Sequence, residues 1–246
     1  MKKVLQKKLS LLKELFFGKI NEEQKNEIVP DLKKQFQNFS FAQEGEDMIL
    51  SRYFEGKQNG TFVDVGAHHP FRFSNTFLFY NKGWRGINID PLPESKELFD
   101  EYRPDDENLC IGISNSESVL TYHMFNEPAL NTFSEEEAKQ KDGIHNGSYF
   151  IIDKIPIETK KLSTVLSESK LIFDKIDFMS IDVEGLDIEV LESNNWDKFR
   201  PEVILVEELS TNIPKIIQES SVYKYLHDRN YDLFYRTINT SFYLRK

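Results

Sequence analysis

The chain has 246 residues, which is long enough to bury a sizeable core as one domain or as two small ones. Its 41 acidic residues outnumber its 31 basic residues, and the formal net charge of −10 argues against nucleic-acid binding, which needs a basic surface. The single cysteine, Cys110, excludes an internal disulfide and fits a reducing, cytoplasmic compartment. Because Cys110 lies in an apolar run, we predict a buried, inert thiol.

Residues 1–40 are interpreted as an N-terminal helical cap on a single domain that covers residues 41–246. Apolar residues recur at helical spacing from Val4 to Phe16, with lysines among them. Such a basic amphipathic helix can make peripheral contact with an anionic membrane, pack on its own domain, or hold a homodimer. We expect neither a membrane span nor a signal peptide, because no apolar run is long enough and no cleavage site follows.

From residue 41 onward, short apolar runs alternate with helical patterns. The runs that predict strands are Thr61–Val65, Gly86–Asp90, Asn108–Ile113, Asp177–Asp182 and Val203–Glu207, and Val119–Phe125 predicts a hairpin after the third of them. The patterns that predict helices are Pro93–Tyr102, Leu162–Glu168 and Leu186–Glu192. This alternation predicts an α/β fold with a mostly parallel, doubly wound sheet. The tail differs: Asp232–Arg236 and Ser241–Leu244 predict a closing antiparallel hairpin.

Acidic side chains end the predicted parallel strands, at the edge where open α/β sheets bind ligands. In chain order these acids are Asp64, Asp90, Asp182 with Glu184, and Glu207 with Glu208. Crowded like charges cost energy, so a cation, a metal ion or a proton should balance them. A carboxylate at the end of the second strand can accept hydrogen bonds from both ribose hydroxyls, which points to a nucleoside near Asp90.

The turn after the first strand narrows the choice of nucleoside. A dinucleotide site needs a G-x-G-x-x-G turn, whose N–H groups hold the pyrophosphate, and the chain has no such turn. Asp64 stands there instead, and a carboxylate would repel phosphate. S-adenosylmethionine carries an adenosine, an ammonium group and a sulfonium but no phosphate. The turn therefore argues against NAD and for a methyl donor.

Five segments together resemble FkbM-type methyltransferases: D-V-G-A at 64–67, S-N-T at 74–76, G-W-R-G-I-N-I-D-P at 83–91, P-A-L-N-T-F at 128–133 and D-F-M-S-I-D-V-E-G at 177–185. The similarity runs from about residue 41 to residue 208. It implies a Rossmann-like methyltransferase fold, S-adenosylmethionine as donor, and a hydroxyl acceptor. We therefore predict O-methylation of a sugar or nucleotide-sugar, in capsule or other surface polysaccharide biosynthesis.

Carried over by position, the resemblance implies a set of donor-binding residues. These are Asp64 and Gly66 at the methionine end, Asp90 at the ribose, Ile113 and Ser114 at the adenine, and Asp182 beside the methyl group. The chain departs from the pattern after Ala67, where His68-His69-Pro70 replaces a further glycine of many relatives. Proline has no N–H, so we expect the donor's carboxylate to be held by other groups, such as Ser74, Asn75 or Thr76.

A sugar hydroxyl is a weak nucleophile near neutral pH, so a base within hydrogen-bond reach should take its proton. Asp182 is the first choice, with Glu184 beside it and with His69, His123 and His145 as the histidine candidates. Asp182, Glu184 and one of Glu207 and Glu208 could instead hold a divalent ion, but capping of the following helix explains these acids almost as well, and a metal is not favoured.

The acceptor is expected to enter through residues 126–149, which show no clear periodicity and form a long polar segment. We assign acceptor binding to Asn131 and Thr132 from this segment and to Glu208 from the end of the last parallel strand. Two other classes stay open: a non-catalytic nucleotide-binding or scaffold protein, and a methyltransferase that acts on a non-sugar small molecule, including one that methylates nitrogen.

Overall fold

The computed structural model describes residues 37–171 and 175–246, and residues 40–246 form one compact unit. The predicted N-terminal helix over Val4–Phe16 lies outside the described residues. Within the described ranges, no helix combines the length and the apolar character that crossing a bilayer requires.

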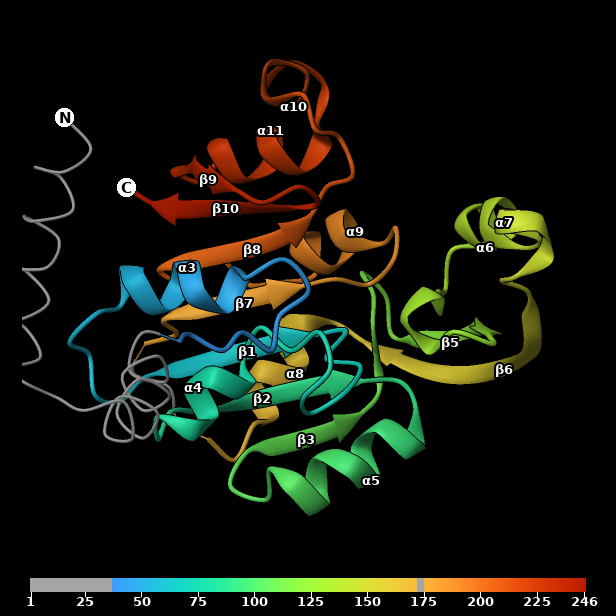
Figure 1. Cartoon of the computed structure of the whole chain (residues 1–246), viewed down its shortest axis with the longest axis horizontal. Helices are drawn as coiled ribbons and strands as arrows, with labels where there is room; N and C mark the ends of the chain where they lie inside the picture. The colour runs from blue at the N-terminus through green and yellow to red at the C-terminus, as the bar shows by residue number, and fades with distance from the viewer. Residues whose placement is uncertain (1–36, 172–174) are drawn as a thin grey trace, which may run out of the picture. The chain divides into compact units, whose positions relative to one another are not determined.

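The centre of the unit is a seven-stranded sheet (Figure 1). In spatial order its strands are β3 (Glu107–Cys110), β2 (Arg85–Asp90), β1 (Thr61–Val65), β7 (Phe178–Ile181), β8 (Val203–Glu207), β10 (Thr240–Arg245) and β9 (Tyr231–Arg236). The pairs from β3 to β8 are parallel, whereas β10 runs antiparallel to both β8 and β9. The predicted fold class is therefore confirmed: an α/β fold with a mainly parallel, Rossmann-like sheet that closes with an antiparallel hairpin.

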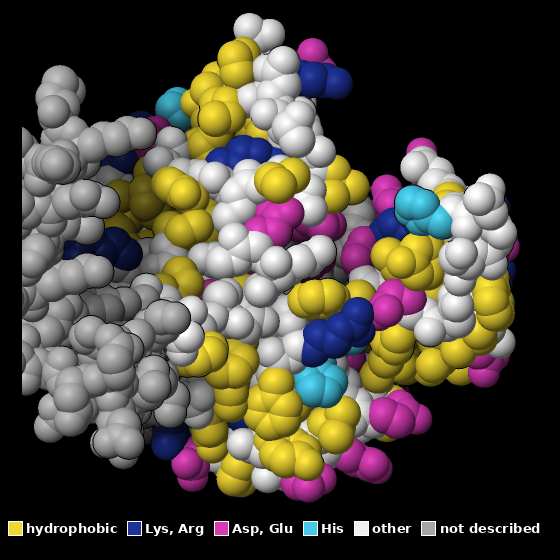
Figure 2. Space-filling model, in the orientation of Figure 1, with side chains coloured by type: hydrophobic (Ala, Val, Ile, Leu, Met, Phe, Trp, Pro, Cys, Tyr) yellow, Lys and Arg dark blue, Asp and Glu magenta, His cyan; other side chains and the backbone are white. Residues whose placement is uncertain are grey.

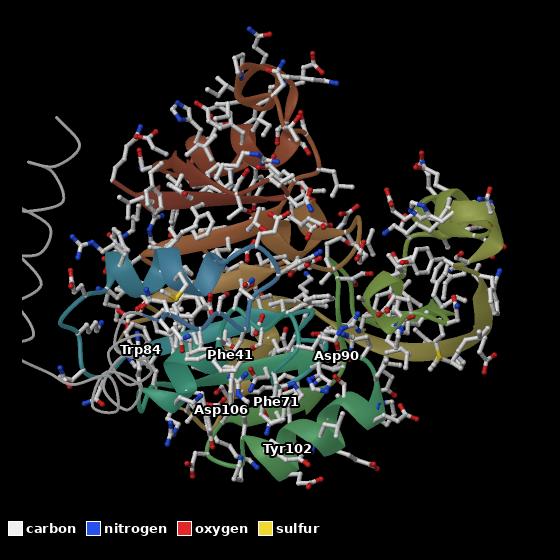
Figure 3. All side chains as sticks on the ribbon, in the orientation of Figure 1. Phe41, Phe71, Trp84, Asp90, Tyr102 and Asp106 are labelled. Carbon is white, nitrogen blue, oxygen red and sulfur yellow. The ribbon has the colours of Figure 1, made fainter. Side chains whose placement is uncertain are left out.

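Helices cover both faces of this sheet, because alternate strand residues point to opposite sides. On one face α8 (Leu162–Glu168), α9 (Asp187–Glu192) and α11 (Ser221–His227) cover a core that includes Val63 and Val65. On the other face α3 (Glu46–Tyr53) and α4 (Phe77–Asn81) cover Phe62 and Trp84. Figure 3 labels Trp84 within this second layer. Each of these side chains is almost fully buried, a burial that stabilises the fold by about 1.5–3 kcal/mol per side chain. The described helices also include α5 (Pro93–Tyr102) and α10 (Ile213–Glu219).

A second sheet, which we call the arm, comprises residues 112–160. Its strands lie in the order β4 (Gly112–Ile113), β6 (Ile151–Lys160) and β5 (Ser118–Phe125). Between β5 and β6 the chain forms the 3₁₀ turn η1 (Pro128–Leu130) and the short helices α6 (Glu135–Lys141) and α7 (Ile144–Gly147). Figure 1 shows the arm beyond the edge at which the parallel strands end.

The structure corrects three expectations from the sequence. The single strand predicted over Asn108–Ile113 is two strands, because the chain leaves the central sheet after Cys110 and joins the arm at Gly112. Residues 126–149 are not structureless, and Ser134 caps α6 by accepting a hydrogen bond from the N–H of Glu137 at 3.2 Å. Cys110 is exposed rather than buried, because β3 is an edge strand; its thiol donates to the Pro91 carbonyl at 3.3 Å.

Candidate active site

A cavity of about 270 Å³ lies where β1, β2, β7 and β8 end and the arm begins. β1 and β7 are neighbours although β2 and β3 lie on the other side of β1, so the strand order reverses here, as at the ligand sites of open α/β sheets. Seven residues singled out from the sequence line this cavity: Gly66, Asp90, Ile113, Asn131, Asp182, Glu184 and Glu207.

Gly66, in the turn after β1, lies against Asp182 at the end of β7. Its φ is +81°, in the left-handed region that glycine tolerates, and a Cβ at this position would overlap the carbonyl oxygen of Asp182. The Gly66 N–H donates to the Ile89 carbonyl at 2.9 Å, which ties the turn to β2. The acid-then-glycine sequence thus allows the ends of β1 and β7 to lie against each other at the cavity floor.

Asp90 ends β2 and is held by the backbone. Its Oδ2 accepts the His68 N–H and its Oδ1 accepts the Leu92 N–H, both at 2.9 Å. Burial raises the pKa of this carboxyl, and the two backbone hydrogen bonds oppose that shift. Each oxygen has a second lone pair for a ligand hydroxyl. Figure 3 labels Asp90 on the side of the sheet that faces the arm.

Asp182, Glu184 and Glu207 form an acidic trio, with one carboxylate oxygen from each lying within 4.8 Å of the others. Asp182 is exposed toward the cavity, while protein atoms crowd its other sides; this partial desolvation, together with Glu207 and Glu184, raises its pKa well above the ordinary range. Burial and the neighbouring Glu184 raise the pKa of Glu207 to about 8. Figure 2 shows acidic side chains gathered where the arm meets the rest of the unit.

The cation beside the trio comes from the arm. Lys141, the last residue of α6, forms an ion pair with Glu184 and a longer one with Glu137 at 3.4 Å. Although burial opposes ionisation, Glu184 and Glu137 raise the pKa of Lys141, and the Glu184 pKa is raised by burial against the pull of this lysine. A second contact joins the same parts, since Thr132 Oγ1 donates to the Glu184 carbonyl at 2.7 Å. The arm therefore places a positive charge beside the trio and holds the backbone of Glu184.

Asp64 does not line the cavity; its side chain is buried on the α4 side of the sheet. Its Oδ2 accepts from Thr76 Oγ1 at 2.8 Å, and Thr76 Oγ1 in turn accepts from Arg103 Nη1 at 2.9 Å. Arg103 also forms a fully buried ion pair with Asp106 at 2.8 Å. Burial raises the pKa of Asp64 to about 6. This carboxylate is therefore balanced from within the protein.

The residues expected to hold the donor's carboxylate are also turned inward. Ser74 is buried and accepts the Phe77 N–H at 3.1 Å, while Asn75 Nδ2 donates to Ser180 Oγ at 3.0 Å. His69 is half-buried outside the cavity. Its Nδ1 accepts the N–H groups of Phe71 and Arg72, each at 3.1 Å. Burial lowers the His69 pKa.

Of the other assigned residues, Ser114 and Glu208 likewise lie off the cavity. Ser114 Oγ donates to the Ser116 carbonyl at 2.7 Å. Glu208 accepts from Tyr243 Oη at 2.6 Å and from Ser220 Oγ, which points it toward the C-terminal hairpin. The alternative histidines stand apart as well: His123 is buried within the arm, and His145 is exposed in α7.

Several cavity residues had no role assigned from the sequence. Gln43, His68, Tyr122 and Lys141 line it, together with Leu209. The S-x-x-E pattern that opens α6 could have revealed a helix that ends at Lys141, since serine followed by glutamate three residues later is a helix-start signature. Nothing in the local sequence indicates that this helix reaches Glu184.

Comparison with known proteins places the chain in a family. The model of the methyltransferase FkbM domain matches residues 64–233, which is more than half of the chain. A C-terminal domain of precorrin-6Y C5,15-methyltransferase from Rhodobacter capsulatus is similar at 10% identity and a TM-score of 0.38, covering 80% of this chain and 85% of that one. A TehB-like SAM-dependent methyltransferase from Corynebacterium glutamicum is similar at 8% identity and a TM-score of 0.38, covering 91% and 97%.

No curated protein sequence matches the chain. The family match covers the end of β1 with its glycine turn, Asp90, the arm and the acidic trio. The chain belongs to the FkbM methyltransferase family, and this membership implies S-adenosylmethionine as its methyl donor and a small molecule as its acceptor.

Proposed function

We propose that the protein methylates a hydroxyl oxygen of a sugar or nucleotide-sugar during the synthesis of a surface polysaccharide. The observation that supports this proposal is that the Gly66 turn lies against the backbone carbonyl of Asp182, whose carboxylate lines the cavity and has a raised pKa. We expect the methyl group of the donor beside this carboxylate. A hydroxyl acceptor needs such a base, and a base works best when its pKa lies near the working pH.

The cavity residues fit S-adenosylmethionine. The free lone pairs of Asp90 suit two ribose hydroxyls, and the apolar side chains of Leu92 and Ile113 suit an adenine ring. The acidic trio suits the positive charges on sulfur and nitrogen. When bound, S-adenosylmethionine would supply an activated methyl group on a positively charged sulfur. The acceptor oxygen would attack the methyl carbon in line with the carbon–sulfur bond, which would break to release S-adenosylhomocysteine.

In the proposed reaction, Asp182 accepts the proton of the acceptor hydroxyl as the new oxygen–carbon bond forms. Lys141 pairs with Glu184 and opposes the rise in the pKa of Glu184, which favours Asp182 as the acceptor of the proton. Alignment of the hydroxyl with the methyl group lowers the barrier further, because the cavity walls fix both reactants. The trio could also hold a divalent ion, but Lys141 already supplies positive charge at Glu184, so we assign no metal.

The arm is the proposed acceptor wall. Asn131 Oδ1 accepts the Phe125 N–H at 2.7 Å, which fixes the amide group at the cavity surface. Tyr122 and Phe133 lie beside it with ring centroids 4.6 Å apart. An amide next to aromatic faces is a common composition for sugar binding, since sugars offer both hydroxyls and apolar ring faces.

Calorimetric titration with S-adenosylmethionine and S-adenosylhomocysteine tests the donor site. Asp90→Ala should lose micromolar binding, whereas Glu101→Ala, an exposed acid at the end of α5, should not. Methyl transfer to a panel of nucleotide-sugars, with and without a chelator, then tests the acceptor class. If the folded protein binds neither donor nor product at millimolar concentration, the proposal is wrong.

One observation favours a second candidate. An acidic trio would also attract a cationic amine, and methylation of nitrogen needs less help from a base. Asp182→Asn separates the two, because it should abolish transfer to oxygen and leave most of the transfer to a nitrogen acceptor.

A further inference from the structure

Arg72 joins two walls of the cavity at its rim. Its Nη1 and Nη2 donate to Oε1 and Oε2 of Glu127 at 2.8 and 3.1 Å, so the loop after β1 is tied to the arm through a two-bond fork. The guanidinium lies 4.4 Å from the Phe73 ring centroid, and Nη1 lies 3.5 Å from His68 Nε2. Both His68 and Phe73 line the cavity, as does Pro128 next to Glu127.

The loop that presents Arg72 has an unusual backbone. His68 and Phe73 have φ values of 55° and 57°, in the left-handed region that side chains other than glycine seldom adopt. Between them, the His69 ring accepts two backbone N–H groups and fixes the turn. Such strain persists only where the surroundings impose it, and it concentrates at ligand sites.

Charge at the cavity explains what Arg72 could do. Four carboxylates line the cavity, and among its described lining residues Lys141 is the single lysine or arginine, already paired with Glu184. The expected donor carries a carboxylate, and a nucleotide-linked acceptor carries phosphate. Ser74 and Thr76 are turned inward, so neither offers its hydroxyl to such an anion.

We propose that Arg72 binds the anionic group of a cavity ligand, and that Glu127 is its partner when that ligand is absent. The inference rests on the proposed function. The anion is a carboxylate or a phosphate, from the methionine part of the donor or from the nucleotide part of the acceptor. An arginine fork matches either group, because both present two oxygens side by side.

The exchange of partners is energetically easy. The side chains of Arg72 and Glu127 are 44% and 29% exposed, so water screens their ion pair and it contributes little to stability. A ligand anion at the cavity rim would be less hydrated and would keep both hydrogen bonds. Glu127 would then turn to solvent, and Arg72 would keep an anionic partner.

Calorimetry on the full-length protein tests this. The probes are S-adenosylmethionine, decarboxylated S-adenosylmethionine, and UDP added to protein saturated with S-adenosylhomocysteine. The variants are Arg72→Gln, Glu127→Gln and, as a control, Arg52→Gln, which removes an exposed arginine of α3 that pairs with Glu55, just after the C-cap of that helix. Circular dichroism confirms that each variant is folded.

If the donor supplies the anion, Arg72→Gln should weaken the affinity for S-adenosylmethionine 10- to 100-fold and change the affinity for decarboxylated S-adenosylmethionine less than twofold. If the acceptor supplies the anion, Arg72→Gln should weaken the binding of UDP alone by that factor. Glu127→Gln, which removes the competing carboxylate, should bind the anionic ligand at least as tightly as the wild type. Arg52→Gln should match the wild type throughout.

Equal losses for S-adenosylmethionine and its decarboxylated form would mean that Arg72 only holds the loop, and would overturn the inference. If Arg72→Gln changes the affinity for every probe less than twofold, the inference is overturned as well. The proposed function would still stand in that case, because the wild-type protein would bind S-adenosylmethionine. A folded wild-type protein that binds no probe at all would overturn both.

Discussion

Gly66 and Asp182 touch between β1 and β7, where the strand order of the parallel sheet reverses. The bare Cα of Gly66 lies against the carbonyl oxygen of Asp182, and the Asp182 N–H donates to the Val65 carbonyl at 3.0 Å. The strand that carries the proposed base and the turn that faces the donor are therefore fixed to one another by backbone contacts.

Replacing Gly66 with alanine should damage stability and binding together. The added methyl group would push the ends of β1 and β7 apart and strain a φ of +81°, so we expect unfolding to become easier by about 3 kcal/mol and donor binding to be lost. Gly56→Ala is the matched control: Gly56 has a φ of +84° but nothing within 4 Å, so it should cost only about 1 kcal/mol. Urea denaturation and calorimetry measure both effects, and equal losses for the two variants would contradict the crowding argument.

The activity should rise with pH as the trio ionises, because Asp182 must lose its proton before it can accept another. Lys141→Met removes the cation that favours the ionised trio, so the acidic limb of the kcat/KM profile should move to higher pH by about one unit. Lys139→Met is the control, since Lys139 pairs with Glu135 on the exposed side of α6. Profiles from pH 6 to 9 that superimpose would show that Lys141 has no electrostatic role.

Asp64 should make the protein less stable as the pH rises. Its pKa is raised from 3.8 to about 6, so the folded state holds the proton more tightly than the unfolded chain does. The stabilisation from this proton is fully present below pH 3.8 and is lost as the pH rises through 6, a change of about 3 kcal/mol. Asp64→Asn keeps an acceptor for Thr76 without the charge. Urea denaturation should show that the variant is the more stable protein at pH 8 and that its advantage shrinks toward pH 4; parallel curves would contradict the assignment.

Neighbouring acids at the end of β8 should behave differently. Glu207 faces the cavity, so Glu207→Gln should lower donor affinity or turnover about tenfold with little effect on folding. Glu208 accepts from Tyr243 and Ser220, so Glu208→Gln should lower the free energy of unfolding by about 1 kcal/mol and leave donor affinity unchanged. Thermal denaturation and calorimetry on the pair test this, and the reverse pattern would refute the side-chain placement.

The strands best predicted from the sequence are those buried on both faces. Thr61–Val65 and Val203–Glu207 match β1 and β8 residue for residue, because an unbroken apolar run bounded by turn residues has few alternatives. The run Asn108–Ile113 looked the same, yet its two halves pair with different sheets. That division depends on β6, whose mixed charges and Pro156 hide its strand character.

The site was predictable where backbone position decides it and unpredictable where a side chain's partner is distant. Gly66, Asp90 and Asp182 line the cavity because strand ends meet at one edge. Asp64 ends on the opposite side because alternate strand residues face opposite ways, and its partner Arg103 reaches it through Thr76. Lys141 reaches the trio only because the arm folds back, which no local pattern encodes.

The strand β4 belongs to the arm by pairing and to the donor cavity by position, since Ile113 lines the cavity while it pairs with Lys160. The arm, which we propose to bind the acceptor, therefore cannot be exchanged without changing the donor cavity. A chimera that swaps the whole arm with a relative would also replace a wall of the donor cavity. A chimera that swaps residues 126–150 alone would keep β4, β5 and β6 intact, but it would still replace Lys141 and with it the cation beside the acidic trio.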